Sequence, residues 1–162
     1  MSWLLRVATA TDLEAIMDIE HETFPQDAWS PATMRAELVD PNGYYLVAVS
    51  AEDPADSAQL AGYAGLRAPR GLEQGDIQTV AVAASARRHG IGRSLVTGLV
   101  SEARQRGIRE IFLEVRADNL AAQQLYSSLG FERIGLRPSY YPPGIDAIVM
   151  RLAVPGPRVV PA

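Results

Sequence analysis

Apolar residues along the chain follow two periodicities, which together predict seven strands and four helices. Short apolar or alternating runs, typical of strands, lie at residues 4–8, 44–51, 59–68, 76–83, 108–115, 131–136 and 146–152. Apolar positions three and four residues apart, typical of helices, lie at residues 12–23, 31–39, 92–105 and 120–129. The strongest helical pattern is at 92–105, where Leu95, Val96, Leu99 and Val100 fall on one face.

Local signals mark where these helices begin and end. Thr11 with Glu14 three residues later forms a candidate capping box. Ser30 before Pro31 is typical of a helix N-terminus, and Gly130 is placed to end the last helix. The order β-α-α-β-β-β-α-β-α-β-β puts antiparallel strands first and βαβ units later. It predicts the α/β (α+β mixed) class, with a mixed sheet covered by helices.

The length of 162 residues favours one domain. We expect this domain to span residues 1–153 and a flexible, proline-rich tail to follow at 154–162, because the last ten residues hold three prolines. No run approaches the roughly 18 apolar residues of a transmembrane helix. The N-terminus also lacks the layout of a signal peptide. The sequence therefore predicts a cytoplasmic location and no membrane partner.

Composition removes several kinds of chemistry. The chain has no cysteine, which excludes disulfides, thiolate zinc sites and a cysteine nucleophile. Its two histidines, His21 and His89, lie far apart in the sequence, so we expect no metal site. All 15 basic residues are arginine, which excludes lysine-based mechanisms, and the net charge is -4. This charge disfavours nucleic acid as a partner and suits a basic peptide or a free amine.

The first chemical motif is R-R-H-G-I-G at residues 87–92, between an apolar strand and the strongest helix. Glycines at 90 and 92 let the backbone approach a ligand closely, and the helix N-terminus offers free N–H groups. The segment therefore predicts a pyrophosphate site. It is neither G-x-G-x-x-G, because Leu occupies position 95, nor a P-loop, because no lysine follows. The alternative is an ordinary helix start with exposed arginines.

The second motif runs over residues 112–131, F-L-E-V-R-A-D-N-L-A-A-Q-Q-L-Y-S-S-L-G-F. Glu114 lies within an apolar strand, where a carboxylate is costly unless it is solvated or paired. Asn119 begins the next helix and Tyr126 lies on it. Taken singly, Glu114 could form a salt bridge to an arginine and Tyr126 could simply pack. The combination with the first motif favours a catalytic site.

The two motifs together resemble those of the GNAT superfamily, the GCN5-related N-acetyltransferases, over about residues 4–152. The resemblance implies the GNAT fold, a central mixed and mostly antiparallel sheet of about seven strands flanked by helices. It implies acetyl-CoA as the co-substrate, with its pantetheine arm between two splayed strands, and no metal. The cofactor-binding residues that it implies are Val80, Ala81, Val82, Arg87, Arg88, His89, Gly90, Ile91, Gly92, Arg93, Ser94, Asn119 and Tyr126.

Three further segments are similar to the RimI-type branch: H-E-T-F-P-Q-D-A-W-S-P, L-E-V-R-A-D-N and R-P-S-Y-Y-P-P-G-I-D-A-I-V-M. That branch acetylates the N-terminal amino group of a small-subunit ribosomal protein. The resemblance implies that Glu114 is the base, that Tyr126 is the acid, and that Trp29, Tyr140 and Tyr141 lie near the peptide. One departure is Arg87, where the pattern often has glutamine, and it leaves the cofactor site intact.

An α-amine is an easier acceptor than lysine for a carboxylate base. The pKa of an α-amine is about 7.7–8.0, against about 10.4 for lysine, so a modest base such as Glu114 suffices. Without cysteine, we expect direct attack in a ternary complex rather than an acyl-enzyme. Glu20 and Glu22 on the acidic first helix could attract a basic peptide, or could belong to a solvated helix face. Acetylation of lysine or of a small amine, and a catalytically silent acyl-CoA-binding module, stay open as alternatives.

Overall fold

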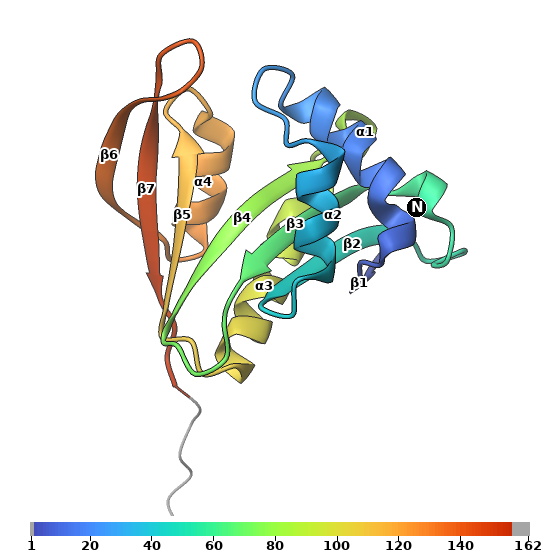
Figure 1. The fold of residues 1–162 in the computed structure, drawn as a ribbon, viewed down its shortest axis with the longest axis horizontal. Helices are drawn as coiled ribbons and strands as arrows, with labels where there is room; N and C mark the ends of the chain where they lie inside the picture. Colours follow the sequence, from blue (N-terminus) through green and yellow to red (C-terminus); the bar gives the residue numbers. More distant parts are fainter. Residues whose placement is uncertain (1, 157–162) are drawn as a thin grey trace, which may run out of the picture.

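The computed structural model describes residues 2–156 and contains the seven strands and four helices in the expected order (Figure 1). The strands are β1 (Trp3–Val7), β2 (Gly43–Ser50), β3 (Gly62–Arg67), β4 (Gln74–Val82), β5 (Glu110–Arg116), β6 (Glu132–Tyr141) and β7 (Ile145–Ala153). The α-helices are α1 (Leu13–Thr23), α2 (Pro31–Val39), α3 (Ile91–Gln105) and α4 (Leu120–Ser128). Short 3₁₀ turns lie at Ala10–Asp12, Ser57–Gln59 and Ala84–Ala86.

One sheet holds all seven strands in the order β1-β2-β3-β4-β5-β7-β6. Every neighbouring pair is antiparallel except β4 and β5, which are parallel. The sheet is therefore mixed and mostly antiparallel, as the sequence predicts. Within residues 2–156, no helix is both long enough and apolar enough to span a membrane.

The two parallel strands pair over a short distance and then diverge. Pairing joins Gln74 to Glu110 and ends at Asp76 with Phe112. Beyond this point residues 77–82 of β4 and 113–116 of β5 separate, and Figure 1 shows the gap between the two ribbons widening toward α4 and α1. A bulge in β4 accompanies the divergence, because Thr79 pairs with Gly65 while Ile77 pairs with the next residue, Leu66. The sheet thus opens in its middle, where the candidate site lies.

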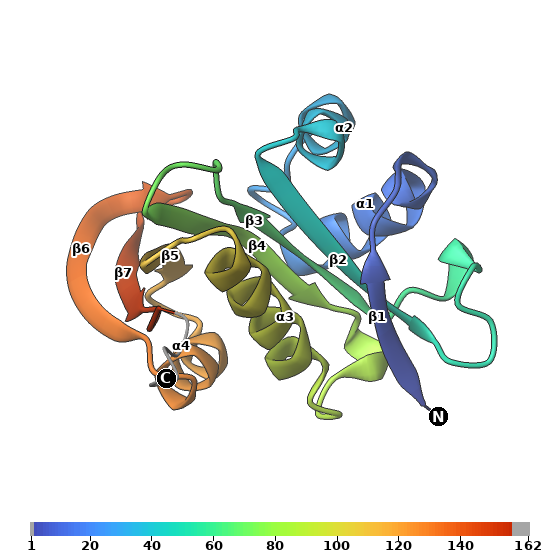
Figure 2. The same cartoon turned by 90° about the horizontal axis from the view of Figure 1, so that it is seen from below.

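Helices cover both faces of the sheet (Figure 2). Helices α1 and α2 lie on one face, over a buried cluster that includes Ile16, Met34 and Val47. Helices α3 and α4 lie on the other, over a larger cluster that includes Leu95 and Leu99. Alternate residues of β2 point to opposite faces, so its central residues are buried on both sides. This double cover explains why the central strands are nearly continuous apolar runs.

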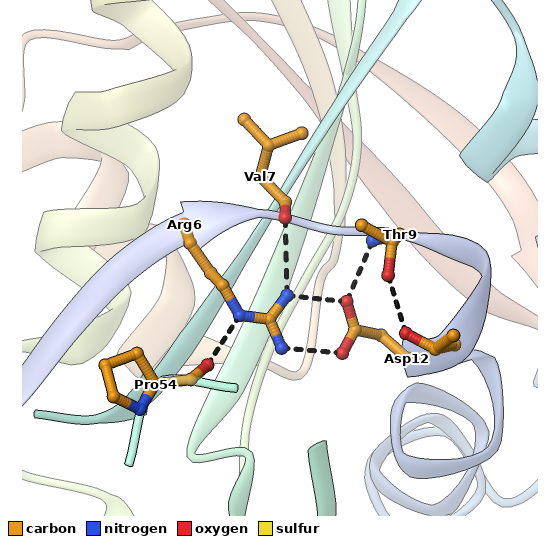
Figure 3. A network of polar contacts seen from close by, with 6 residues as sticks. Arg6, Val7, Thr9, Asp12 and Pro54 are labelled. Atoms are coloured by element: carbon orange, nitrogen blue, oxygen red, sulfur yellow. Dashed lines mark hydrogen bonds and ion pairs between the residues drawn. The ribbon is translucent and has the colours of Figure 1, made fainter. Parts of the chain in front are cut away.

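The predicted capping box at Thr11 and Glu14 is wrong. Helix α1 begins at Leu13, after the 3₁₀ turn, and Thr11 lies within that turn. The acidic partner is Asp12, whose Oδ2 accepts a 2.8 Å hydrogen bond from the Thr9 N–H. Arg6 holds the same buried carboxylate through two 2.8 Å contacts, which join β1 to the start of α1 (Figure 3). A two-point ion pair of this kind fixes orientation as well as charge.

Several predicted boundaries also change; strand β3, for example, begins at Gly62 rather than at residue 59, which lies in a 3₁₀ turn. Strand β6 extends to Tyr141, rather than ending at residue 136, so both tandem tyrosines lie at its end. Val154 does not belong to a free tail, because its side chain is buried in the larger core cluster and its N–H donates to the Arg109 carbonyl at 2.8 Å. The remainder of the predicted flexible tail, residues 157–162, lies outside the described residues.

Candidate active site

Two adjoining cavities occupy the opening between β4 and β5. The larger has a volume of about 590 Å³ and the smaller about 130 Å³. Seven residues line both of them: Asp27, Trp29, Ile77, Gln78, Leu113, Glu114 and Tyr141. They come from the α1–α2 loop, from the two diverging strands and from the end of β6. The cavities therefore form one cleft, which enters the sheet at the point where pairing stops.

Glu114 lies in the wall shared by the two cavities. Its Oε1 is 3.0 Å from Arg137 Nε, and the Tyr140 hydroxyl lies close enough for the Glu114 carboxylate to raise the pKa of Tyr140. The salt bridge that the sequence left open is thus present, and it does not withdraw the carboxylate from the cleft. The side chain keeps 24% of its surface exposed. A half-buried carboxylate facing a cleft can accept a proton from a bound amine.

Tyr126 lies on α4 and lines the smaller cavity, together with Glu114. Its side chain is 8% exposed, and its ring meets Phe131 edge-to-face with centroids 5.8 Å apart. Burial raises the pKa of the Tyr126 phenol well above its usual value, and the nearby Tyr141 adds to this effect. The phenol is therefore neutral at ordinary pH and can donate a proton.

The tandem tyrosines close one side of the cleft. Tyr140 lines the larger cavity and is 50% exposed, whereas Tyr141 lines both cavities. Their ring centroids are 5.0 Å apart, at an angle of 87°. Burial, and next the charge of Glu114, raise the pKa of Tyr141 to about 12. The guanidinium of Arg116 lies 5.5 Å from the centre of the Tyr141 ring, within the range of a cation–π contact.

Trp29 forms part of the opposite wall and lines both cavities. The backbone N–H of Trp29 donates a 2.8 Å hydrogen bond to Oε2 of Glu20, and the hydroxyl of Tyr63 donates to Oε1 of the same carboxylate. Glu20 is 2% exposed, so it does not belong to a solvated helix face. It lines the smaller cavity from the end of α1. Glu22, in contrast, is exposed, and its Oε1 accepts from the Ala84 N–H at 3.0 Å.

The predicted pyrophosphate segment leads into α3 from the end of β4. Gly90 occupies the N-cap position with φ +75°, a conformation that glycine adopts without strain. A Cβ on Gly92 would lie 3.3 Å from a methyl group of Leu125, so α3 approaches α4 closely at this point. Arg87, Arg88, His89 and Arg93 are exposed around the turn. This arrangement leaves the N-terminus of a fifteen-residue helix open to an anion.

Only some of the predicted cofactor residues line the cleft. Val80, Asn119 and Tyr126 line the smaller cavity, whereas residues 81–82 and 87–94 lie outside both cavities. Ala81 is buried beneath α1, so only its backbone could meet a ligand. Asn119 also caps α4, because its Oδ1 accepts from the Ala122 N–H at 3.1 Å. The described part of the chain holds no group of three or more His, Asp or Glu side chains suited to a metal ion.

Four polar residues of the larger cavity were not predicted as site residues: Asp27, Asp76, Gln78 and Arg137. Burial, and next the charge of Glu114, raise the pKa of Asp76. Asp76 pairs with Phe112 in register, and Glu114 follows two residues later, so all three side chains share one face. An acidic residue beside the buried Ile77 at the start of a strand was the available signal. Arg137 opens the R-P-S-Y-Y segment of the resemblance, but its place beside Glu114 depends on β6 lying beyond β7.

Comparison with known proteins places these features in a family. A model of the acetyltransferase (GNAT) family matches residues 13–131. The chain is 38% identical over 149 residues to N-alpha-acetyltransferase RimI of Mycobacterium tuberculosis, covering 88% of this chain and 87% of that protein. It is 33% identical over 155 residues to the [ribosomal protein bS18]-alanine N-acetyltransferase of Salmonella typhimurium, covering 93% and 97%.

An uncharacterized protein of Mycobacterium leprae, ML0378, is 38% identical over 147 residues, and the chain spans only 38% of that longer protein. Among solved structures, the ribosomal-protein-S18-alanine N-acetyltransferase of Escherichia coli superimposes with a TM-score of 0.83 at 29% identity, covering 97% of each chain. The ribosomal-protein-alanine N-acetyltransferase of Brucella melitensis gives 0.77 at 27% identity, over 93% and 99%. The chain with the opened sheet and the Glu114–Tyr126 cleft belongs to the GNAT family of acetyltransferases.

Proposed function

We propose that the protein transfers the acetyl group of acetyl-CoA to the N-terminal α-amino group of a protein, namely a small-subunit ribosomal protein. The observation that carries this proposal is that Glu114 and Tyr126, from two separate elements, line the same small cavity. A base and an acid are the two groups that amide formation from a thioester needs. The relatives named as acetylating bS18 support the choice of acceptor.

The acceptor amine must lose a proton to become a nucleophile. At pH 7 about a tenth of an α-amine is already neutral, because the pH lies within about one unit of the pKa of the amine. A weak base such as Glu114 is therefore enough to remove the proton from the remainder. The neutral nitrogen attacks the thioester carbonyl carbon, a C–N bond forms and the C–S bond breaks. The proton released by the amine passes to Glu114, directly or through a water molecule.

The sulfur leaves as a thiolate, the conjugate base of a thiol with a pKa of about 8.5, and takes a proton from the neutral Tyr126 phenol in the same cavity. The second proton that the nitrogen loses as the amide forms then restores the phenol. During attack the carbonyl oxygen gains negative charge, and a backbone N–H of β4 near Val80 can stabilise it. Both steps take place where β4 and β5 have separated and backbone groups are free to face a ligand.

The two ends of the donor fit two parts of the structure. The exposed arginines around the Gly90 turn and the open N-terminus of α3 suit the pyrophosphate. The gap between β4 and β5 suits the pantetheine arm, whose amides can pair with strand backbone. A ribosomal acceptor would place this reaction in the cytoplasm, where we propose that the protein works.

The test is incubation with acetyl-CoA and a peptide mixture, followed by mass spectrometry. The mixture contains a peptide with the N-terminal sequence of bacterial bS18, the same peptide with its N-terminus blocked, and a lysine-containing peptide. We expect acetylation of the free bS18 N-terminus and none of the blocked form. Acetylation of lysine alone would favour the alternative acceptor. Binding of acetyl-CoA without transfer to any peptide would favour a silent acyl-CoA-binding module.

A further inference from the structure

Glu20 is a buried carboxylate in an unfavourable position. It is 2% exposed and lies in the last turn of α1, where the helix dipole is negative. None of the ion pairs between described residues includes it. Burial of a charge without a cation is costly, and hydrogen bonds must compensate for it. Two hydrogen-bond donors compensate for the burial of Glu20.

Both carboxylate oxygens are occupied. Oε2 accepts from the Trp29 backbone N–H at 2.8 Å, and Oε1 accepts from the Tyr63 hydroxyl. Tyr63 is fully buried on β3, and burial together with the charge of Glu20 raises its pKa, so it stays a neutral donor. Charge-assisted bonds of this kind are stronger than bonds between neutral groups.

Tyr63 also lies next to the strand on the donor side of the cleft. The Thr79 side chain lies close enough to the Tyr63 hydroxyl to lower its pKa, and Thr79 lines the smaller cavity next to Val80. Tyr63 and Glu20 thus connect β3 and α1 to the loop that follows α1. Among the described residues, Glu20 is the residue whose side chain hydrogen-bonds to the loop at 25–29.

That loop supplies the wall of the cleft opposite the tandem tyrosines, through Asp27 and Trp29. We propose that Glu20 is a positioning residue: it holds Trp29 in the wall, and so sets the affinity for the acceptor peptide without affecting the affinity for acetyl-CoA. This inference rests on the proposed function for the identity of the acceptor. The position of Trp29 can be measured without any acceptor.

The experiment uses the two tryptophans of the chain. Trp3→Phe leaves Trp29 as the sole tryptophan, and its quenching by acrylamide reports how firmly the wall is held. In this background we expect Glu20→Ala to make Trp29 more accessible to the quencher. With the bS18 peptide we expect KM to rise about tenfold or more, which corresponds to the loss of a buried hydrogen bond to a charged group. The Kd of acetyl-CoA should stay as in the parent.

Three variants separate positioning from general damage. Glu20→Gln keeps an oxygen for the Trp29 N–H, so it should give a smaller rise in KM, and Tyr63→Phe should change KM in the same direction. Glu37→Gln is the matched control, because Glu37 accepts from the buried Tyr45 at 3.4 Å but lies outside both cavities. It should leave KM and Trp29 quenching unchanged.

The outcomes discriminate between the two proposals. Unchanged Trp29 quenching in Glu20→Ala would overturn the positioning role, whatever the acceptor is. The role would also be overturned if Glu37→Gln raised KM as much as Glu20→Gln did. Increased quenching in Glu20→Ala with no acetylation of the peptide, even by the parent, would support the positioning role and reject the proposed acceptor. Should Glu20→Ala fail to fold, Glu20→Gln and Tyr63→Phe carry the same readouts.

Discussion

Arg137 reaches from the edge strand β6 across β7 to Glu114 on β5, with 3.0 Å between Arg137 Nε and Glu114 Oε1. The guanidinium also lies 5.6 Å from the centre of the Tyr140 ring, and the Tyr140 hydroxyl lies near the same glutamate, which raises the pKa of Tyr140. The carboxylate is therefore held from one side by a cation and a phenol, while its other side faces the cleft. This arrangement orients the proposed base.

Arg137→Gln is expected to lower kcat/KM severalfold without loss of stability. The arginine side chain is 59% exposed, and exposed ion pairs contribute about 0–1 kcal/mol to folding. Peptide kinetics and thermal unfolding measure the two effects. Arg151→Gln is the matched control, because Arg151 pairs with Glu110 at 3.2 Å outside the cleft. Equal activity losses in both variants would contradict an orienting role for Arg137.

Glu114→Gln should reduce the rate most at low pH. The amine has a pKa of about 8, so below this pH most of it is protonated and a base is needed. Above it the amine is already neutral, and the gap to the parent should narrow. A pH–rate profile of kcat/KM checks this. A profile lowered by one constant factor would instead mean that Glu114 positions the amine.

Tyr126→Phe should keep acetyl-CoA binding and lower kcat by about 10²–10⁴-fold, the usual contribution of a general acid. The substitution removes a hydroxyl and little volume. Because burial raises the pKa of Tyr126, the donor stays protonated as pH rises, and the parent should show no loss of activity from its ionisation up to about pH 10. Calorimetry measures acetyl-CoA binding by the variant, and a pH profile of kcat measures the activity of the variant and of the parent. A parental kcat in the variant would assign the proton to solvent or another group.

Gly90→Val should weaken acetyl-CoA binding at least tenfold. Gly90 has φ +75°, so a valine there strains the backbone. Because nothing lies within 4 Å of a Cβ built on Gly90, the valine side chain would not clash with the protein but would occupy space next to the bound ligand. Gly107→Val is the control at the other end of α3, with φ +85° and similarly open space. Both variants should lose about 1–2 kcal/mol of stability or slightly more. Unchanged calorimetric affinity in a folded Gly90→Val protein would reject the pyrophosphate assignment.

The order of elements could be predicted because each carries a local signal. The helix at α3 follows from Leu95, Leu99 and the glycines before it, and the strand at β5 follows from its alternating apolar residues. The motif around Glu114 and Tyr126 was found for the same reason. Family, fold class and strand number could thus be predicted from the sequence.

The partners of the site residues could not be predicted, because they depend on strand order. Nothing near Arg137 in sequence indicates that β6 lies beyond β7, two strands from Glu114. Glu20 looks like one more acid on a polar helix, and its burial follows from Tyr63, 43 residues away. The end of β6 was placed too early, at residue 136, and beyond Arg137 the strand departs from regular pairing with β7 until Tyr141.

The separation of β4 from β5 makes the stability of the protein depend on its ligand. Where β4 and β5 do not pair, backbone groups of both strands lack a neighbouring strand, and a ligand bound between them can take the place of that strand. Any ligand that binds only the folded state stabilises it by mass action, by about 2.7 kcal/mol at one hundred times its Kd. The thermal unfolding temperature should therefore rise with acetyl-CoA concentration, and starvation for the donor should leave the enzyme both idle and more open to proteolysis.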